Sequence, residues 1–199
     1  YSIDVAIYDF NFNNIEDIAA ALNTAFYNGI TIRAIYDTTW SDVNLGGVLD
    51  GDIHSLIAPN NEGYGIMHNK FVIIDAMSTD ANDPIVWTGS TNFEGENINT
   101  FANNVIIFQD QSLAKAYTLE FNEMWGNSTP TPDVNYSRFG PDKKDNTPHE
   151  FIIGGNRVEC YFIPSDGTTD HIVSSIESAN EELFVETMLI TRYDISDAI

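Results

Sequence analysis

Three residues near the middle of the chain have types and a spacing that suit chemistry on a phosphate group: His68-x-Lys70-x(4)-Asp75. Side chains alternate along an extended segment, so His68 and Lys70 should point to the same face. Lys70 is one of only two basic residues before Lys115, which makes a lysine kept for solubility an unexpected use of a cation here. A neutral imidazole can attack phosphorus and then leave, dividing one difficult displacement into two easier steps.

A second polar group, Gly-Ser-x-Asn at residues 89–92, follows after a turn. The short apolar runs at 71–74 and 85–87 predict a hairpin, which would return Ser90 and Asn92 to a position beside the histidine and the lysine. On its own, this second group would be ordinary turn chemistry. Next to an ammonium, its hydroxyl and carboxamide can hold the non-bridging oxygens of a phosphodiester, and that chemistry needs no divalent metal.

The elements that must position these groups alternate between strand and helix, which predicts an α/β fold with a mixed β-sheet flanked by helices. The first strand and the second should be parallel because a helix connects them. The expected elements are a strand at 3–8, a helix from an Asn14 cap to Gly29, a strand at 30–36, a loop at 38–63 with one short possible helix at 43–49, a strand at 105–108, and a helix from an Asp110 cap to Gly126.

The composition changes abruptly at residues 127–150, which hold four of the seven prolines and predict a linker. Beyond it the chain predicts a strand, a helix and a second strand. A shift of 180 residues places Ile3 on Leu183, a weak internal repeat that coincidence explains equally well. The expected elements are a strand at 158–163, a helix at 169–180 with Ile172, Ile176 and Ala179 inward, and a strand at 183–190.

The charge, the remaining histidines and the single cysteine limit which ligands and cross-links the chain can have. The chain carries 8 Lys and Arg against 30 Asp and Glu, a net charge of -22, which disfavours nonspecific binding to nucleic acid. The remaining histidines, at 54, 149 and 171, lie in unrelated segments, so we expect no metal site and no cofactor. Cys160 is the single cysteine and leaves no internal disulfide.

No apolar run is long enough to span a membrane, and no signal peptide is evident. Residue 1 is Tyr and the chain opens inside a strand-like run, so we expect a piece of a longer protein. Its cellular address stays open, with a secreted or cell-envelope bacterial protein as the expectation.

Together the two polar groups resemble the phospholipase D superfamily, whose signature is H-x-K-x(4)-D followed by G-S-x-N. The resemblance extends over most of residues 3–126 and implies a phospholipase-D-like half-domain at 1–126, a linker at 127–150, and the incomplete beginning of a second such domain at 151–199. It implies that His68 is the nucleophile or its acid partner and acts with Lys70. The other implied roles are phosphate binding for Ser90 and Asn92 and a mainly structural role for Asp75.

Two features depart from the family pattern. Members commonly carry a glutamate eleven residues after the signature asparagine, thought to orient the imidazole, and here that position is Asn103. An amide can accept from the ring N–H but stabilises an imidazolium less well than a carboxylate does. Family sites also use two copies of the motif, whereas this chain has one, so the second should come from downstream sequence or from another copy of the chain in a homodimer.

The expected function is a metal-independent phosphodiester hydrolase or transferase that works through a phosphohistidine. A phospholipid is favoured over nucleic acid as the substrate, because a groove that follows a phosphate backbone needs many cations. Two alternatives remain: a nuclease of the same superfamily, and a non-catalytic phospholipase-D-like scaffold or binding module.

Overall fold

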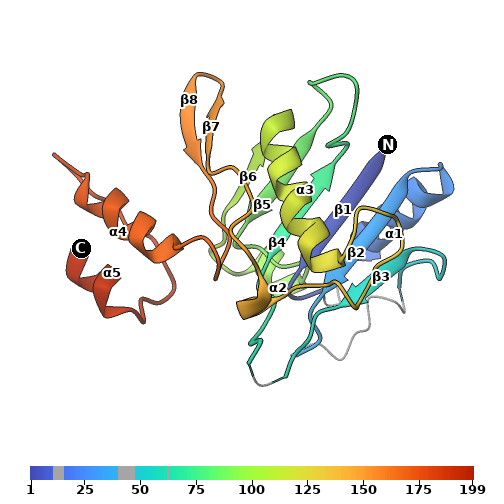
Figure 1. Cartoon of the computed structure of the whole chain (residues 1–199), viewed down its shortest axis with the longest axis horizontal. Helices are drawn as coiled ribbons and strands as arrows, with labels where there is room; N and C mark the ends of the chain where they lie inside the picture. The colour runs from blue at the N-terminus through green and yellow to red at the C-terminus, as the bar shows by residue number, and fades with distance from the viewer. Residues whose placement is uncertain (11–15, 40–47, 62) are drawn as a thin grey trace.

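The computed structural model describes residues 1–10, 16–39, 48–61 and 63–199. Its centre is a six-stranded sheet in the order β3-β2-β1-β4-β5-β6 (Figure 1). β1, β2 and β3 are parallel to one another, and β4, β5 and β6 continue the sheet in antiparallel pairs. The expected α/β class with a mixed sheet is confirmed. The strands are β1 (Ser2–Ile7), β2 (Thr31–Tyr36), β3 (His54–Ile57), β4 (Lys70–Ile74), β5 (Ile85–Gly89) and β6 (Val105–Phe108).

Helices cover both faces of the sheet, and each face has its own apolar cluster. α3 (Gln111–Trp125) packs on one face with Phe71 and Ile73 of β4, while Val72 between them packs on the other face. This alternation follows from the two-residue period of a strand. α1 (Glu16–Tyr27) contributes to the second cluster, and the short α2 (Gly95–Asn99) follows β5.

Both ends of α3 form as the sequence predicts. The Asp110 carboxylate accepts a hydrogen bond of 2.8 Å from the Leu113 N–H, which satisfies one of the unpaired donors in the first turn. Gly126 ends the helix at φ 89°, in the left-handed region that glycine adopts most readily. A Cβ at that position would lie 2.0 Å from the Asp133 carbonyl oxygen, so the close approach of the next segment also requires glycine.

The loop expected at 38–63 contains one regular element that the sequence analysis missed. β3 pairs parallel to β2 with Arg33 opposite His54. Its four residues show no clear alternation, so the hydrogen-bonding edge of β2 is what makes them a strand. Residues 48–49 lie in a turn, and residues 43–47 and the expected Asn14 cap lie outside the described residues.

The segment after α3 packs against the same core as the sheet. It forms a single 3₁₀ turn, η2 (Gly140–Asp142), and a hairpin of β7 (Glu150–Ile153) with β8 (Asn156–Glu159). Phe139, Phe151 and Phe162 are buried in the cluster that also holds Trp125. The prediction of a strand at 158–163 is wrong beyond Glu159, because the Phe162 N–H turns to the Asp166 carboxylate at 2.7 Å instead of a neighbouring strand.

The C-terminal segment consists of two helices, α4 (Thr168–Glu177) and α5 (Tyr193–Ala198), which Figure 1 shows beside the sheet rather than on it. The prediction of a strand at 183–190 is wrong. A strand is held by a partner, and no described segment pairs with these residues. Two of the side chains expected to be inward on the helix, Ile172 and Ala179, are exposed. The division into domains stays a prediction.

Within the described part of the chain, no helix has both the length and the apolar character that a membrane crossing requires.

Candidate functional site

The candidate site lies at one end of the sheet, where β1, β2 and β5 end and β4 begins. β1 and β2 run toward this end, and β4 begins there, because Lys70 lies opposite Ile7 in an antiparallel pair. Two backbone hydrogen bonds extend the pairing past the strand ends: Tyr8 N–H to the Asn69 carbonyl (2.8 Å) and Phe93 N–H to the Asp9 carbonyl (3.0 Å). The topology therefore gathers residues that are far apart in the sequence.

His68 and Lys70 lie together against one aromatic ring. The His68 imidazole packs on Tyr8 with 4.6 Å between ring centroids, and the Lys70 ammonium lies 5.0 Å from the centre of the same ring. The ammonium also donates a hydrogen bond of 3.1 Å to the His68 carbonyl. Lys70 is buried, with 7% of its surface exposed, whereas His68 remains open to solvent. The exposed His68 imidazole and the buried Lys70 ammonium thus share one aromatic ring.

The electrostatics of this pair favour a neutral imidazole next to a cation. Partial burial of the ring and the nearby Lys70 ammonium lower the pKa of His68, against a smaller opposing effect of Asp37. Burial lowers the pKa of Lys70 to about 8, and the Asp9 carboxylate acts in the opposite direction. At neutral pH the neutral, nucleophilic form of His68 is therefore favoured, while Lys70 stays largely protonated.

Asn92 contacts Asp9, the acid whose charge acts on Lys70. The Asn92 side-chain oxygen accepts a 3.4 Å hydrogen bond from the Asp9 N–H, and its amide group contacts the Asn97 side-chain oxygen at 3.4 Å. One carboxylate oxygen of Asp9, Oδ1, is buried without a hydrogen-bond partner among the described residues. Burial and Glu94 raise the pKa of Asp9, whereas the Lys70 ammonium lowers it. Asp9 is thus a half-buried acid whose charge is only partly compensated, a pattern found at functional sites.

Ser90 is exposed and belongs to a hydrogen-bonded corner with residues 103–104. Its hydroxyl donates to the Asn103 side-chain oxygen and accepts from the Asn104 N–H, both at 3.0 Å. The preceding Gly89 has φ 152°, and a Cβ there would lie 2.2 Å from the Asn104 carbonyl oxygen. The glycine of the Gly-Ser-x-Asn group is therefore needed for this close approach of the two chain segments.

Asn103 has both ends of its amide engaged away from the imidazole. Its oxygen accepts from Ser90, and its nitrogen donates to the Asn97 backbone and side-chain oxygens at 3.1 and 3.2 Å. These contacts orient Ser90. An orienting role toward His68, which the resemblance implies for this position, stays a prediction.

Asp75 lies at the opposite end of β4 from Lys70 and His68. Its carboxylate accepts a 2.7 Å hydrogen bond from the Ser2 N–H, and its own N–H donates to the Ser2 carbonyl at 2.9 Å. The residue has φ 52°, a left-handed conformation that aspartate tolerates better than most residues. These contacts join the end of β4 to the start of β1, as a structural residue would.

Asp9 and Asp37 belong to the site although the sequence analysis assigned them no role in it. Asp37 is 2% exposed and accepts backbone hydrogen bonds from Met67 (3.0 Å) and Thr39 (2.7 Å), so it fixes the loop that carries His68. Asp37 follows β2 directly, and Asp9 follows β1 after one residue. Acidic residues after adjacent parallel strands could have indicated them, because such strand ends meet at one edge.

No cluster of three or more His, Cys, Asp or Glu side chains that could hold a metal ion occurs among the residues the structure describes.

Similarity to known proteins identifies the family of this chain. The profile of the family described as "Cardiolipin synthase, PLD-like domain" matches residues 1–125, which include every strand of the large sheet and both motif groups. The mitochondrial cardiolipin hydrolase of Canis lupus familiaris is 26% identical over 149 residues, covering 72% of this chain and 53% of the relative. That of Drosophila melanogaster is 29% identical over 143 residues, covering 63% and 53%. The chain therefore spans about half the length of these relatives.

The fold has counterparts among solved structures. The phospholipase D family member Nuc from Salmonella typhimurium superposes with a TM-score of 0.51 at 20% identity, over 69% of this chain and 80% of that one. With the profile match over residues 1–125, the conclusion is direct: this chain belongs to the phospholipase D superfamily, in the family of cardiolipin-synthase-type PLD-like domains.

Proposed function

We propose that the protein cleaves or transfers a phosphodiester through a phosphohistidine at His68, without a metal ion. The observation that carries the proposal is the exposed His68 imidazole beside the buried Lys70 ammonium, both on the Tyr8 ring. The environment of His68 lowers its pKa and so favours the neutral form. We therefore assign the nucleophile, rather than the acid partner, to this histidine.

The reaction has two displacements at phosphorus. An imidazole nitrogen of His68 forms a bond to phosphorus, and the bond to the leaving oxygen breaks with both of its electrons. A second histidine, from another motif, gives its proton to that oxygen. The second histidine then takes a proton from water or an alcohol, whose oxygen displaces His68 and releases the phosphoryl product. Lys70 and Asn92 hold the non-bridging oxygens during both steps, and Ser90 supplies a hydroxyl at the rim.

The second motif has two possible sources, and an apolar sheet edge supports contact with a further unit. β6 is an edge strand with three consecutive exposed apolar residues, Val105, Ile106 and Ile107. Consecutive residues point to opposite faces, so both faces of this edge are uncovered. Val105 lies opposite Gly89, next to the Ser90 corner. A second copy, or a second half elsewhere in the full-length protein, would cover this edge and reach the site.

A phospholipid is the substrate we favour. The two relatives reported above are named cardiolipin hydrolases. The net charge of -22 opposes a polyanionic nucleic acid. A nuclease of the superfamily is the alternative, and hydrolysis of single-stranded oligonucleotides in preference to anionic phospholipid vesicles would favour it.

The proposal is tested with the full-length protein and bis(p-nitrophenyl) phosphate. His68→Asn should reduce kcat/KM on the order of 10⁴-fold or more, because the nucleophile is lost. Turnover of the unaltered protein should survive EDTA. His54→Asn is a matched control, since His54 is exposed on β3 and contacts Thr131 at 3.1 Å.

Acid-quenched mass spectrometry of the reacting protein should detect a phosphoryl adduct on His68. Undiminished turnover in a folded His68→Asn variant would rule out this mechanism. Phosphodiester binding without turnover by the unaltered protein would favour the scaffold reading.

A further inference from the structure

A cavity of about 680 Å³ opens beside His68. Three segments form its walls: residue 59 with residues 63–69, the end of α3 with residues 139–143, and residues 161–164. The volume falls in the range of about 300–1,000 Å³ that is usual for small-molecule sites. Because His68 and Asn69 belong to the lining, a group bound in the cavity would be directly next to a phosphorus atom at the imidazole.

The floor of this cavity is apolar. Met67, Met124, Phe139 and Phe162 each have 7% or less of their surface exposed. Methionine side chains adapt to flexible apolar partners because they are unbranched and polarizable. The floor therefore suits hydrocarbon.

Lys143, the only lysine or arginine in the lining, is already engaged. Its ammonium forms an ion pair with the buried Glu120 carboxylate and donates a 2.9 Å hydrogen bond to the Ile163 carbonyl. The side chain is 4% exposed. It holds the 139–143 segment against α3 and has no exposed surface to offer to a chain of phosphates.

Two aromatic rings of the lining, those of Tyr161 and Phe162, are also committed to protein contacts. Tyr161 stacks on His171 with 3.8 Å between centroids and on His149 with 4.8 Å. Phe162 packs edge-on with Tyr117 at 5.0 Å. Binding of single-stranded nucleic acid uses accessible aromatic faces and accessible cations, and these residues provide neither.

We propose that this cavity binds the acyl or alkyl substituent of a phosphodiester whose phosphorus lies at His68. The inference rests on the proposed function and adds the means of substrate selection. Residues 139–143 and 161–164, which follow the sheet in the sequence, then form part of the wall of the substrate site. Substrates with a long hydrocarbon group are then preferred over small phosphodiesters with the same leaving group, because each buried methylene contributes to binding.

The test compares p-nitrophenyl octyl phosphate with p-nitrophenyl methyl phosphate, which release the same chromophore. With the full-length protein, kcat/KM for the octyl ester should exceed that for the methyl ester by at least about 50-fold, the equivalent of burying about three methylene groups. Ile66→Glu places a charge on an exposed rim residue of the cavity and should reduce this ratio at least about tenfold. Ile57→Glu, an equally exposed isoleucine on β3, should keep the ratio.

A binding measurement separates this inference from the proposed function. Calorimetry with the His68→Asn variant should show tighter binding of the octyl ester than of the methyl ester, whether or not the protein turns over. Turnover of both esters at similar kcat/KM would leave the proposed function standing and overturn the cavity assignment, as would an octyl preference that Ile66→Glu does not change. If the unaltered protein binds the octyl ester but does not turn it over, the cavity assignment is supported and the enzymatic proposal is overturned.

Discussion

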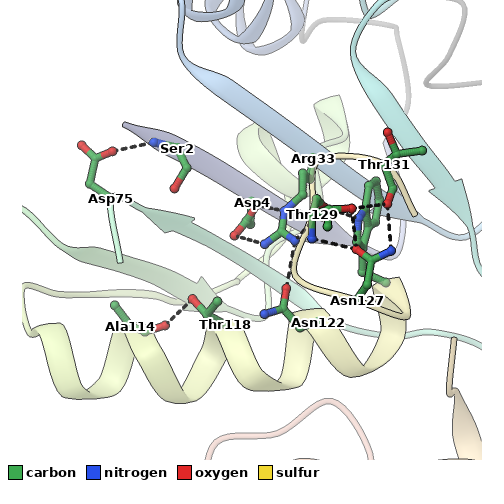
Figure 2. Close-up of polar contacts among 11 residues, drawn as sticks. Ser2, Asp4, Arg33, Asp75, Ala114, Thr118, Asn122, Asn127, Thr129 and Thr131 are labelled. Carbon is green, nitrogen blue, oxygen red and sulfur yellow. Dashed lines mark hydrogen bonds and ion pairs between the residues drawn. The ribbon is translucent and has the colours of Figure 1, made fainter. Parts of the chain in front are cut away.

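Arg33 and Lys70 are the two basic residues that precede Lys115, and each is buried to 7% exposure, yet the structure uses them differently. The Arg33 guanidinium donates to both carboxylate oxygens of Asp4, at 2.6 and 2.8 Å, and to the Asn122 side-chain oxygen at 2.9 Å (Figure 2). It also lies over the rings of Phe121 and Trp125. Nearly all of its hydrogen-bonding capacity is met by the protein.

Lys70 has fewer partners for its charge. Within the described structure its ammonium has one hydrogen bond, to the His68 carbonyl, although it has three N–H donors. The acid that acts on it, Asp9, has a buried oxygen with no hydrogen-bond partner among the described residues. The difference teaches that burial alone does not identify a functional cation. A cation whose donors are satisfied stabilises the fold, whereas one with donors to spare can bind a ligand.

The largest effect we expect in this comparison is on stability, at Arg33. Arg33→Met would leave the Asp4 carboxylate, 3% exposed, without its cation and should lower the free energy of unfolding by about 3–5 kcal/mol. Urea denaturation followed by circular dichroism measures this. The double variant Arg33→Met with Asp4→Leu should recover most of the loss, because the buried charge is then gone as well. A loss below about 1 kcal/mol in the single variant would contradict a structural role.

The second expected effect is on activity, at Lys70. Lys70→Met should reduce kcat/KM about 10²–10³-fold, since one donor to the developing negative charge is removed. The free energy of unfolding should stay the same or rise, because the variant removes a buried charge that has few partners. Hydrolysis of bis(p-nitrophenyl) phosphate and urea denaturation measure the two quantities. A variant that loses stability as Arg33→Met does, while keeping its activity, would erase the distinction between the two cations.

The smallest expected effect is on the pH profile. The protonated form of Lys70 binds the phosphoryl oxygens, and it decreases as the pH rises through the Lys70 pKa of about 8. At pH 9 about a tenth of it remains, so activity should fall roughly tenfold between pH 7 and 9. Lys70→Arg should have a lower rate but no such fall, because a guanidinium stays charged. If the activity of this variant falls just as much between pH 7 and 9, the fall is due to a group other than Lys70.

Local sequence signals account for much of the fold that was predicted correctly. The hairpin of β4 and β5 follows from two apolar runs around a turn, and α3 follows from its helical period, the Asp110 cap and the Gly126 end. Each signal acts within a few residues of the element that it specifies, so no tertiary contact is needed to recognise it. The failures have the opposite character. β3 is a strand because β2 supplies its partner, and residues 183–190 are not a strand because they have none.

The candidate site divides in the same way. The spacing from His68 to Lys70 predicted two neighbouring side chains, and they lie on the same tyrosine ring. Asp9 and Asp37 lie about 30 to 60 residues away in the sequence, and no local spacing joins them to the histidine. Their place follows from the order and direction of the strands, which bring the ends of β1 and β2 to the start of β4.

By itself, the sequence determined which functional groups the protein has and how the nearest of them are spaced, because side-chain chemistry and the two-residue period of a strand are local properties. Only the tertiary structure decided that Arg33 has most of its donors engaged, that Lys70 keeps donors available, and that a cavity opens beside His68. Those properties depend on which distant groups lie together in a low-dielectric interior. Burial and the order of the strands determine which groups these are, and both are properties of the whole chain.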